Sequence, residues 1–194
     1  KNRAGAFHQP RIVITDVVTV QTLPARELTS GWCECIKQGA IGSRKLFKQT
    51  TAYLSQINGK PIAVSSQLEK LIAAHCAFKA SVVSAGVRED PARTDRRSRR
   101  VLNFGHTVGH ALEALTGYRR FRHGEAVGWG MSVAGTLSKN LGLLDKSELE
   151  LLLAGIRSCG SLPSAENIDV AAIVHAIKRD KKSGHGQLQW VLLE

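Results

Sequence analysis

The stretch NFGHTVGHALE, residues 103–113, places two histidines four residues apart among glycines and an asparagine. Positions i and i+4 share one face of an α-helix, so a helix here makes His106 and His110 neighbours. Gly105 and Gly109 lower helix propensity, which is tolerable where small residues let another helix or a ligand come close. A plain helical core would use Leu or Ala at these positions, so the stretch predicts a closely packed helix that carries chemistry.

The same two histidines admit more than one interpretation. Helical pairs at this spacing bind zinc in one class of peptidases, in which a glutamate directly follows the first histidine. Thr107 occupies that place here, so peptidase chemistry is not expected. The pair alone is compatible with a metal site, with proton transfer, or with two hydrogen-bonded structural histidines.

Two other stretches carry residues that bind metals. HGEAVGWGM begins with His123, either a ligand or a cap, and its small residues allow close packing against the first helix. In CECIKQG, Glu34 stands among apolar residues, where a carboxylate is costly to bury unless it is paired or coordinated. A surface ion pair with Lys37 is the alternative. Three protein ligands with an open fourth position are typical of catalytic zinc or a similar divalent ion. The candidate set is Glu34, His106 and His123.

Hydrophobic spacing along the chain predicts a mostly helical domain. The β-branched run RIVITDVVTV predicts a strand over 11–20, and QLQWVLL predicts a short strand over 187–193. Between them, apolar residues at helical spacing predict a series of helices. Their expected ranges are about 24–41, 43–57, 66–87, 99–116, 124–141, 146–158 and 169–179. We therefore expect residues 1–194 to form a single, mostly α domain with short strands near both ends.

Composition limits the classes of function. The 194 residues are 43% hydrophobic and 22% charged, no apolar run is long enough to span a bilayer, and the four cysteines lack zinc-type spacing. We therefore expect a cytoplasmic protein with reduced thiols and no membrane partner. The net charge of +11 is compatible with nucleic-acid binding, with a solvated basic face, or with a small phosphorylated, carboxylated substrate. The aromatic content of 5% disfavours base stacking, and we expect no nucleic-acid partner.

Six motifs together resemble one known family. They are KNRAGAFHQP (1–10), TLPARELTSGWCECIKQG (22–39), KASVV (79–83), NFGHTVGHALE (103–113), HGEAV (123–127) and RDKK (179–182). In this order, and nearly spanning the chain, they are similar to the C-terminal, metal-binding domain of the 3-dehydroquinate synthase family among the sugar-phosphate cyclases. The resemblance implies the helical fold of that domain, a phosphorus–oxygen lyase of the shikimate pathway, NAD, and one divalent ion, zinc or cobalt.

The resemblance also implies a role for particular residues. The divalent ion is bound by Glu34, His106 and His123, which leaves His110 to transfer protons beside it. Catalysis is implied for His110, Glu89 and Lys37, and substrate binding for Lys79, Arg99, Asn103, Lys181 and Asn2, with Lys182 as the alternative to Lys181. Contacts with NAD are implied for Lys1, Thr19, Val20, Gln21 and Thr22. The implied reaction converts 3-deoxy-arabino-heptulosonate 7-phosphate, a phosphorylated sugar acid, to 3-dehydroquinate and phosphate.

The sequence departs from the family pattern in three places. Gly86 and Val87 stand where the family usually has an Asp-Glu pair, and the loop that follows carries extra residues. Arg93, Arg96 and Arg97 are therefore alternatives to Arg99. Cys33 and Cys35 flank the proposed glutamate ligand, where a thiolate could tune or compete for a soft metal.

The family pairs this domain with an N-terminal dinucleotide-binding half, and often forms homodimers. No G-x-G-x-x-G motif occurs in the sequence, so the resemblance implies that the N-terminal domain is absent from this chain and that the isolated chain is inactive. Two alternatives keep other functions open. One is another sugar-phosphate cyclase, such as 2-deoxy-scyllo-inosose or 2-epi-5-epi-valiolone synthase, and the other is a non-catalytic basic helical binding module.

Overall fold

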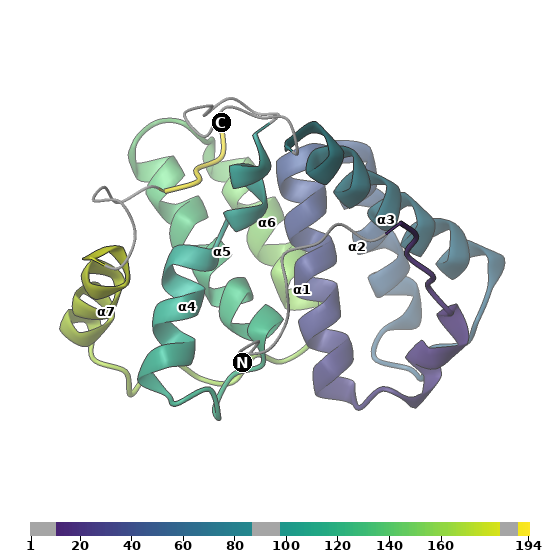
Figure 1. Ribbon diagram of the computed structural model, residues 1–194, viewed down its shortest axis with the longest axis horizontal. Coiled ribbons are helices and arrows are strands. Elements are labelled where there is room, and N and C mark those ends of the chain that lie inside the picture. The colour runs from purple at the N-terminus through teal and green to yellow at the C-terminus, as the bar shows by residue number, and fades with distance from the viewer. Residues whose placement is uncertain (1–10, 87–97, 183–189) are drawn as a thin grey trace.

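The computed structural model describes residues 11–86, 98–182 and 190–194 (Figure 1). Within them the chain is mostly helical, as the sequence predicts. The α-helices are α1 (Ala25–Gly42), α2 (Arg44–Ile57), α3 (Ser66–Gly86), α4 (His106–Leu115), α5 (His123–Asn140), α6 (Lys146–Ser158) and α7 (Val170–Lys182). Two 3-10 helices, η1 (Val17–Thr22) and η2 (Arg99–Asn103), complete the elements.

The helices enclose two hydrophobic clusters that share α5. The larger cluster is built around α1 and is covered by α2, α3, α5 and α6, with Ile36, Leu68, Phe104 and Met131 among its fully buried side chains. The smaller cluster lies between α4, α5 and α7, with Leu112 and Ala126 at its centre. In Figure 1, α4 and α5 lie side by side, α5 packs against α1, and α7 covers the outer side of α4. This arrangement brings the beginnings of α4 and α5 towards the middle of α1.

The close approach of α4 and α5 depends on glycine, as the sequence predicts. Gly105 has φ = +79°, a left-handed conformation that favours glycine, and it forms the N-cap of α4. A Cβ atom at Gly105 would lie 2.8 Å from the Val127 carbonyl oxygen, and one at Gly109 would lie 3.3 Å from the Ala126 backbone. The two helix backbones therefore meet without intervening side chains.

The single helix expected over 99–116 is wrong in one respect. The chain forms η2, leaves helical geometry at Phe104 and Gly105, and begins α4 at His106. The reason is that Gly105 must adopt positive φ to reach α5, and this conformation cannot continue a right-handed helix. As a result His106 is the first residue of its helix.

The expected strands near the ends are not present in the described residues. Over 11–20, the Asp16 carboxylate accepts the Val18 N–H and caps η1, and Ile12, Val13 and Ile14 remain 74–84% exposed without a neighbouring strand. Of the second expected strand, residues 187–189 lie outside the described residues. The remainder packs on the helices, where the Leu193 N–H donates to the Ser138 hydroxyl over 3.0 Å. Local capping and contact with helices take the place of sheet pairing.

None of the helices in the described residues has the length and apolar character needed to cross a membrane.

Candidate active site

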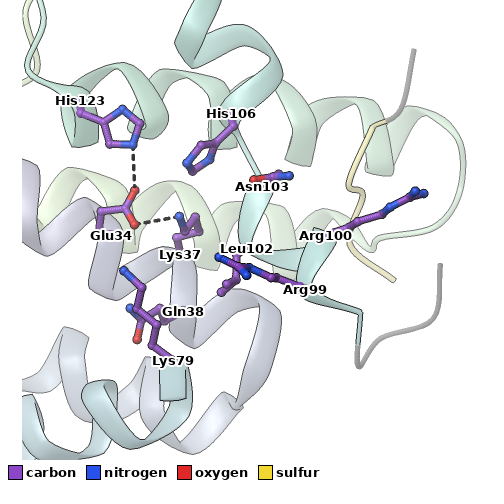
Figure 2. A pocket seen from close by; sticks show the side chains of 10 residues that line it. All are labelled: Glu34, Lys37, Gln38, Lys79, Arg99, Arg100, Leu102, Asn103, His106 and His123. Carbon is purple, nitrogen blue, oxygen red and sulfur yellow. Dashed lines mark hydrogen bonds and ion pairs between the residues drawn. The ribbon is translucent and has the colours of Figure 1, made fainter. Parts of the chain in front are cut away.

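Three residues from separate helices converge at one point. Glu34 lies in the middle of α1, His106 begins α4 and His123 begins α5. One ligand atom from each lies within 4.8 Å of the others, and the ring centroids of the two histidines are 5.1 Å apart. Figure 2 shows both rings and the carboxylate directed towards the same space. The sequence proposes this set, and the fold brings it together.

The Glu34 carboxylate has one satisfied and one unsatisfied oxygen. Oε2 accepts a hydrogen bond from the Lys37 ammonium over 2.7 Å, whereas Oε1 is buried without a hydrogen-bond partner. Nε2 of His123 lies 3.7 Å from Oε1, which is too far for a hydrogen bond. Two ligands of a tetrahedral zinc ion stand roughly 3.3 Å apart, so a divalent ion fits between these atoms. A buried orphan oxygen is the feature expected of an unfilled metal ligand.

Lys37 is not the surface partner that the alternative interpretation requires. Its side chain is nearly enclosed, with the whole residue 4% exposed. Burial lowers the pKa of Lys37, against the opposing effect of the Glu34 carboxylate. Burial alone would raise the pKa of Glu34, but the Lys37 charge and the neighbouring histidines bring it below its usual value. Glu34 therefore remains an anion at neutral pH, as a metal ligand must.

The His106 ring is held in the form that binds metals. Its Nδ1 donates to the Phe104 carbonyl oxygen over 3.2 Å, because a carbonyl can only accept. Burial first, and then the Lys37 charge, lower the pKa of His106 to about 4. The ring is therefore neutral at pH 7, with its lone pair on Nε2, the nitrogen not bonded to Phe104.

The beginning of α5 is fixed by contacts with α1, and these place His123. The fully buried Glu125 accepts from Arg26 Nε over 2.8 Å and from the Arg122 N–H over 2.7 Å. The Gly124 N–H donates to the Ser30 hydroxyl over 2.8 Å. A Cβ atom at Gly124 would collide with the Ser30 carbonyl oxygen, so only glycine permits this approach.

The three candidate ligands lie on the wall of a cavity of about 640 Å³ (Figure 2). Four cationic side chains line it, and Glu34 is its single acidic lining residue in the described part of the chain. The lining also includes Gln38, Leu102 and Asn103. The cations are Lys37, Lys79, Arg99 and Arg100, of which Arg100 extends away from the candidate ligands in Figure 2. Such a cavity suits a multiply anionic small molecule.

His110 lies beside the candidate ligands, and not on the cavity wall. It is exposed, and its ring centroid is 5.2 Å from that of His106 and 6.0 Å from that of His123. A second set of possible ligand atoms, from His110, Glu113 and His123, also lies within 4.8 Å. Because both sets use His123, an ion bound by one set leaves the other set without this ligand.

Several residues proposed from the sequence fall elsewhere. Thr19, Val20, Gln21 and Thr22 form part of η1, which contacts α3, and they do not line the cavity. Lys181 and Lys182 belong to α7, which packs against α4, but their side chains are not described. Lys1, Asn2, Glu89, Arg93, Arg96 and Arg97 lie outside the described residues.

Sequence reasoning missed part of the cavity and its support. Gln38 lies four residues after Glu34 on α1, so helical spacing could have identified it. Its Oε1 is 3.1 Å from Nδ1 of the buried His75, whose Nε2 is 2.9 Å from the Thr50 hydroxyl. Nothing in the local sequence links three residues that lie on α1, α3 and α2.

The cysteines beside Glu34 do not belong to the candidate ligand groups of the described residues. All four thiols are free, as expected. Burial raises the pKa of Cys35 to about 12, so its thiol stays protonated at neutral pH and is a poor ligand. Neither group of possible ligands found in the described residues includes a cysteine. The expectation that a thiolate tunes the site is not supported.

Comparisons with known proteins give one consistent result. The family described as 3-dehydroquinate synthase C-terminal matches residues 31–183. The chain is 44% identical over 195 residues to a 3-dehydroquinate synthase of Synechococcus sp., covering 99% of this chain and 50% of the relative. It is 39% identical over 193 residues to that of Thermoanaerobacter pseudethanolicus, covering 100% and 52%. The chain thus spans about half the length of these curated relatives.

A solved structure shows the same fold. It is ValA, a 2-epi-5-epi-valiolone synthase from Streptomyces hygroscopicus subsp. jinggangensis with NAD+ and Zn2+ bound. The TM-score is 0.83 at 22% sequence identity, and the match covers 100% of this chain and 51% of ValA. At this identity the likeness establishes the fold alone.

Proposed function

Because this chain belongs to the 3-dehydroquinate synthase C-terminal family, we propose that it is the metal- and substrate-binding part of a 3-dehydroquinate synthase. In that role it acts together with an N-terminal NAD-binding half. The proposed reaction converts 3-deoxy-arabino-heptulosonate 7-phosphate to 3-dehydroquinate and phosphate. The observation that carries the proposal is the convergence of Glu34, His106 and His123 on the wall of a cationic cavity.

The donor set fits a divalent ion such as zinc or cobalt. One carboxylate and two imidazoles would leave an open position for a substrate oxygen, and the buried Glu34 Oε1, which has no hydrogen-bond partner, is the carboxylate oxygen available to the ion. When bound, the ion supplies Lewis-acid polarisation of a substrate hydroxyl, and NAD supplies a reversible hydride acceptor. The chain's own residues then hold the substrate and move its protons.

The positive charge of the cavity is complementary to a substrate that carries both a phosphate and a carboxylate. Lys79 and Arg99 line the cavity together with Glu34, Arg100 lies further along its wall, and Asn103 adds an amide that can bond to hydroxyl groups. Arginine can bind a carboxylate or phosphate through two parallel hydrogen bonds, which fixes the orientation of the substrate. A sugar phosphate without the carboxylate would leave part of this charge uncompensated, so we favour the dehydroquinate reaction over the other cyclase reactions.

Proton transfer is proposed for His110 and Lys37. His110 is exposed beside both histidine ligands, so its ring can exchange protons between solvent and the neighbourhood of the metal site. Lys37 contacts Glu34, and burial lowers its pKa, which makes its ammonium a better proton donor than an exposed lysine. Glu89 is proposed as a second acceptor on the strength of its motif alone.

The metal site can be tested on the purified chain. We expect one equivalent of zinc or cobalt per chain by elemental analysis after dialysis, and loss of binding in Glu34→Ala and His106→Ala. Glu69→Ala, which changes a glutamate on α3 away from the cavity lining, is the matched control and should retain the metal. Absence of stoichiometric metal in the folded chain, together with salt-sensitive binding to DNA, would instead favour the basic binding module.

The reaction can be tested on the chain joined to its NAD-binding half. Release of inorganic phosphate is measured with 3-deoxy-arabino-heptulosonate 7-phosphate and, separately, with a heptulose 7-phosphate that lacks the carboxylate. We expect turnover of the first substrate only, and reduced turnover in Arg99→Gln. Preference for the substrate without the carboxylate would assign the chain to another sugar-phosphate cyclase.

A further inference from the structure

Glu113 is a buried acid next to the candidate metal site. It lies on α4 and is 6% exposed. Its Oε2 lies 3.2 Å from Nδ1 of His123, and this imidazole is the side-chain partner that the described residues offer it. A buried carboxylate without a partner is costly. The contact with His123 therefore stabilises the buried Glu113 carboxylate, with or without an ion in the site.

The His123 ring lies between two carboxylates. Its Nδ1 faces Glu113, and its Nε2 faces the unsatisfied Oε1 of Glu34 at 3.7 Å. A carboxylate can only accept a hydrogen bond from a ring N–H, so the hydrogen of His123 is drawn to Nδ1. The lone pair is then on Nε2, which points towards Glu34 and His106.

We propose that Glu113 is a positioning residue for the metal site. It accepts the Nδ1–H of His123, and so fixes both the orientation of the ring and the nitrogen that is free to bind the ion. The Phe104 carbonyl does the same for His106, over the same distance of 3.2 Å. The two imidazoles are therefore held in matching fashion, one by a backbone oxygen and one by a buried carboxylate. This inference rests on the metal site of the proposed function.

The second possible ligand set gives Glu113 a different role. In that set Glu113 would itself bind an ion together with His110 and His123. Two observations favour the positioning role. The Glu113 oxygen already lies within hydrogen-bond distance of His123, whereas Glu34 Oε1 has no hydrogen-bond partner. The cavity wall includes Glu34, His106 and His123, but neither Glu113 nor His110, so an ion at the first set is the one that a substrate can reach.

The test measures metal affinity of the purified, metal-free chain. Zn²⁺ and Co²⁺ affinities are determined by competition with a chelator, and the Co²⁺ absorption bands report the coordination of the bound ion. We expect Glu113→Ala to bind about 10–100-fold more weakly than the wild type, with the Co²⁺ bands retained. Glu113→Gln should lose less, because its amide oxygen still accepts the Nδ1–H. Glu148→Gln removes the same charge from a glutamate paired with Arg44, and it should leave the affinity unchanged.

The outcomes separate this inference from the proposed function. If the wild type binds one ion and Glu34→Ala does not, the metal site stands. Equal affinity of Glu113→Ala and wild type then overturns the positioning role alone. Loss of binding in Glu113→Ala with retention in Glu34→Ala makes Glu113 a ligand, and overturns both. Circular dichroism of the metal-free variants tests the fold. If Glu113→Ala is unfolded, Glu113→Met decides, because it keeps the bulk of the side chain and cannot accept the Nδ1–H, and affinity equal to that of Glu148→Gln overturns the role.

Discussion

Acidification should destabilise the chain through one buried histidine that is not part of the metal site. His75 is 5% exposed on α3, between Gln38 of α1 and Thr50 of α2. Burial lowers its pKa from 6.5 to about 4. Because the folded state resists protonation of His75 while the unfolded state accepts it at pH 6.5, stability is full above pH 6.5 and falls as the pH drops towards 4.

The size of the effect follows from the two pKa values. Each pH unit between 6.5 and about 4 is worth about 1.4 kcal/mol, so the full loss is about 3 kcal/mol, of which most is reached by pH 4.5. His75→Gln removes the titrating group. It should cost about 1–3 kcal/mol at pH 7.5, because the bonds to Gln38 and Thr50 are disrupted. It should also reduce the loss between pH 7.5 and 4.5 by about 2–3 kcal/mol relative to the wild type.

Urea unfolding, followed by circular dichroism in the presence of EDTA, measures this difference. His106 also titrates in the same window, since burial lowers its pKa to about 4, but its contribution is common to both proteins and cancels in the comparison. His175→Gln, at an exposed position on α7, is the matched control and should keep the wild-type pH dependence. Parallel stability curves for wild type and His75→Gln would refute the reasoning.

Three further substitutions test the packing that positions the site. Gly130→Ala should lower the melting temperature by several degrees, because its Cβ would collide with the Gly105 carbonyl oxygen. Gly31→Ala has open space around the new Cβ and should raise the free energy of unfolding by about 0.5–1 kcal/mol. Thermal unfolding of both variants measures the two effects. Arg26→Gln should destabilise the metal-free chain and weaken Zn²⁺ binding, because it leaves the fully buried Glu125 without its cation at the beginning of α5; unchanged chelator competition would show that this ion pair does not position His123.

Local sequence patterns predicted the helices well, because each depends on neighbours a few residues away. The periodic apolar residues of 66–87 and 146–158 correspond to α3 and α6 almost to the residue. The pattern failed where a long-range contact decides the backbone. The break at Gly105 exists because α5 approaches there, and α5 follows about twenty residues later. The β-branched run 11–20 likewise forms a strand only where another strand pairs with it, and no such strand lies beside it in the described residues.

The candidate ligands could be proposed from residue type, but their support could not. Glu34, His106 and His123 are residues that bind divalent ions, so a search by chemistry finds them. Glu113 lies seven residues after His106 on the same helical face, but its partner is ten residues further on, at the start of another helix. Its role depends on the angle at which α4 meets α5, and that angle is set by backbone contacts rather than by any motif.

The same junction explains where the positive charge of the chain acts. His106 and His123 begin α4 and α5 and both line the cavity, so each of these helix N-termini, with its partial positive charge, lies beside the cavity. They add to the four cations of the cavity wall, against the single carboxylate of Glu34. A net charge of +11 spread over the surface would favour any polyanion, but charge gathered in a cavity of about 640 Å³ favours a small one. Because Glu34 stays ionised between Lys37 and the histidines, it opposes a second anion near the ion while it attracts the cation itself. The phosphate and carboxylate of the substrate should therefore lie towards Lys79 and Arg99, with its hydroxyl groups towards Glu34.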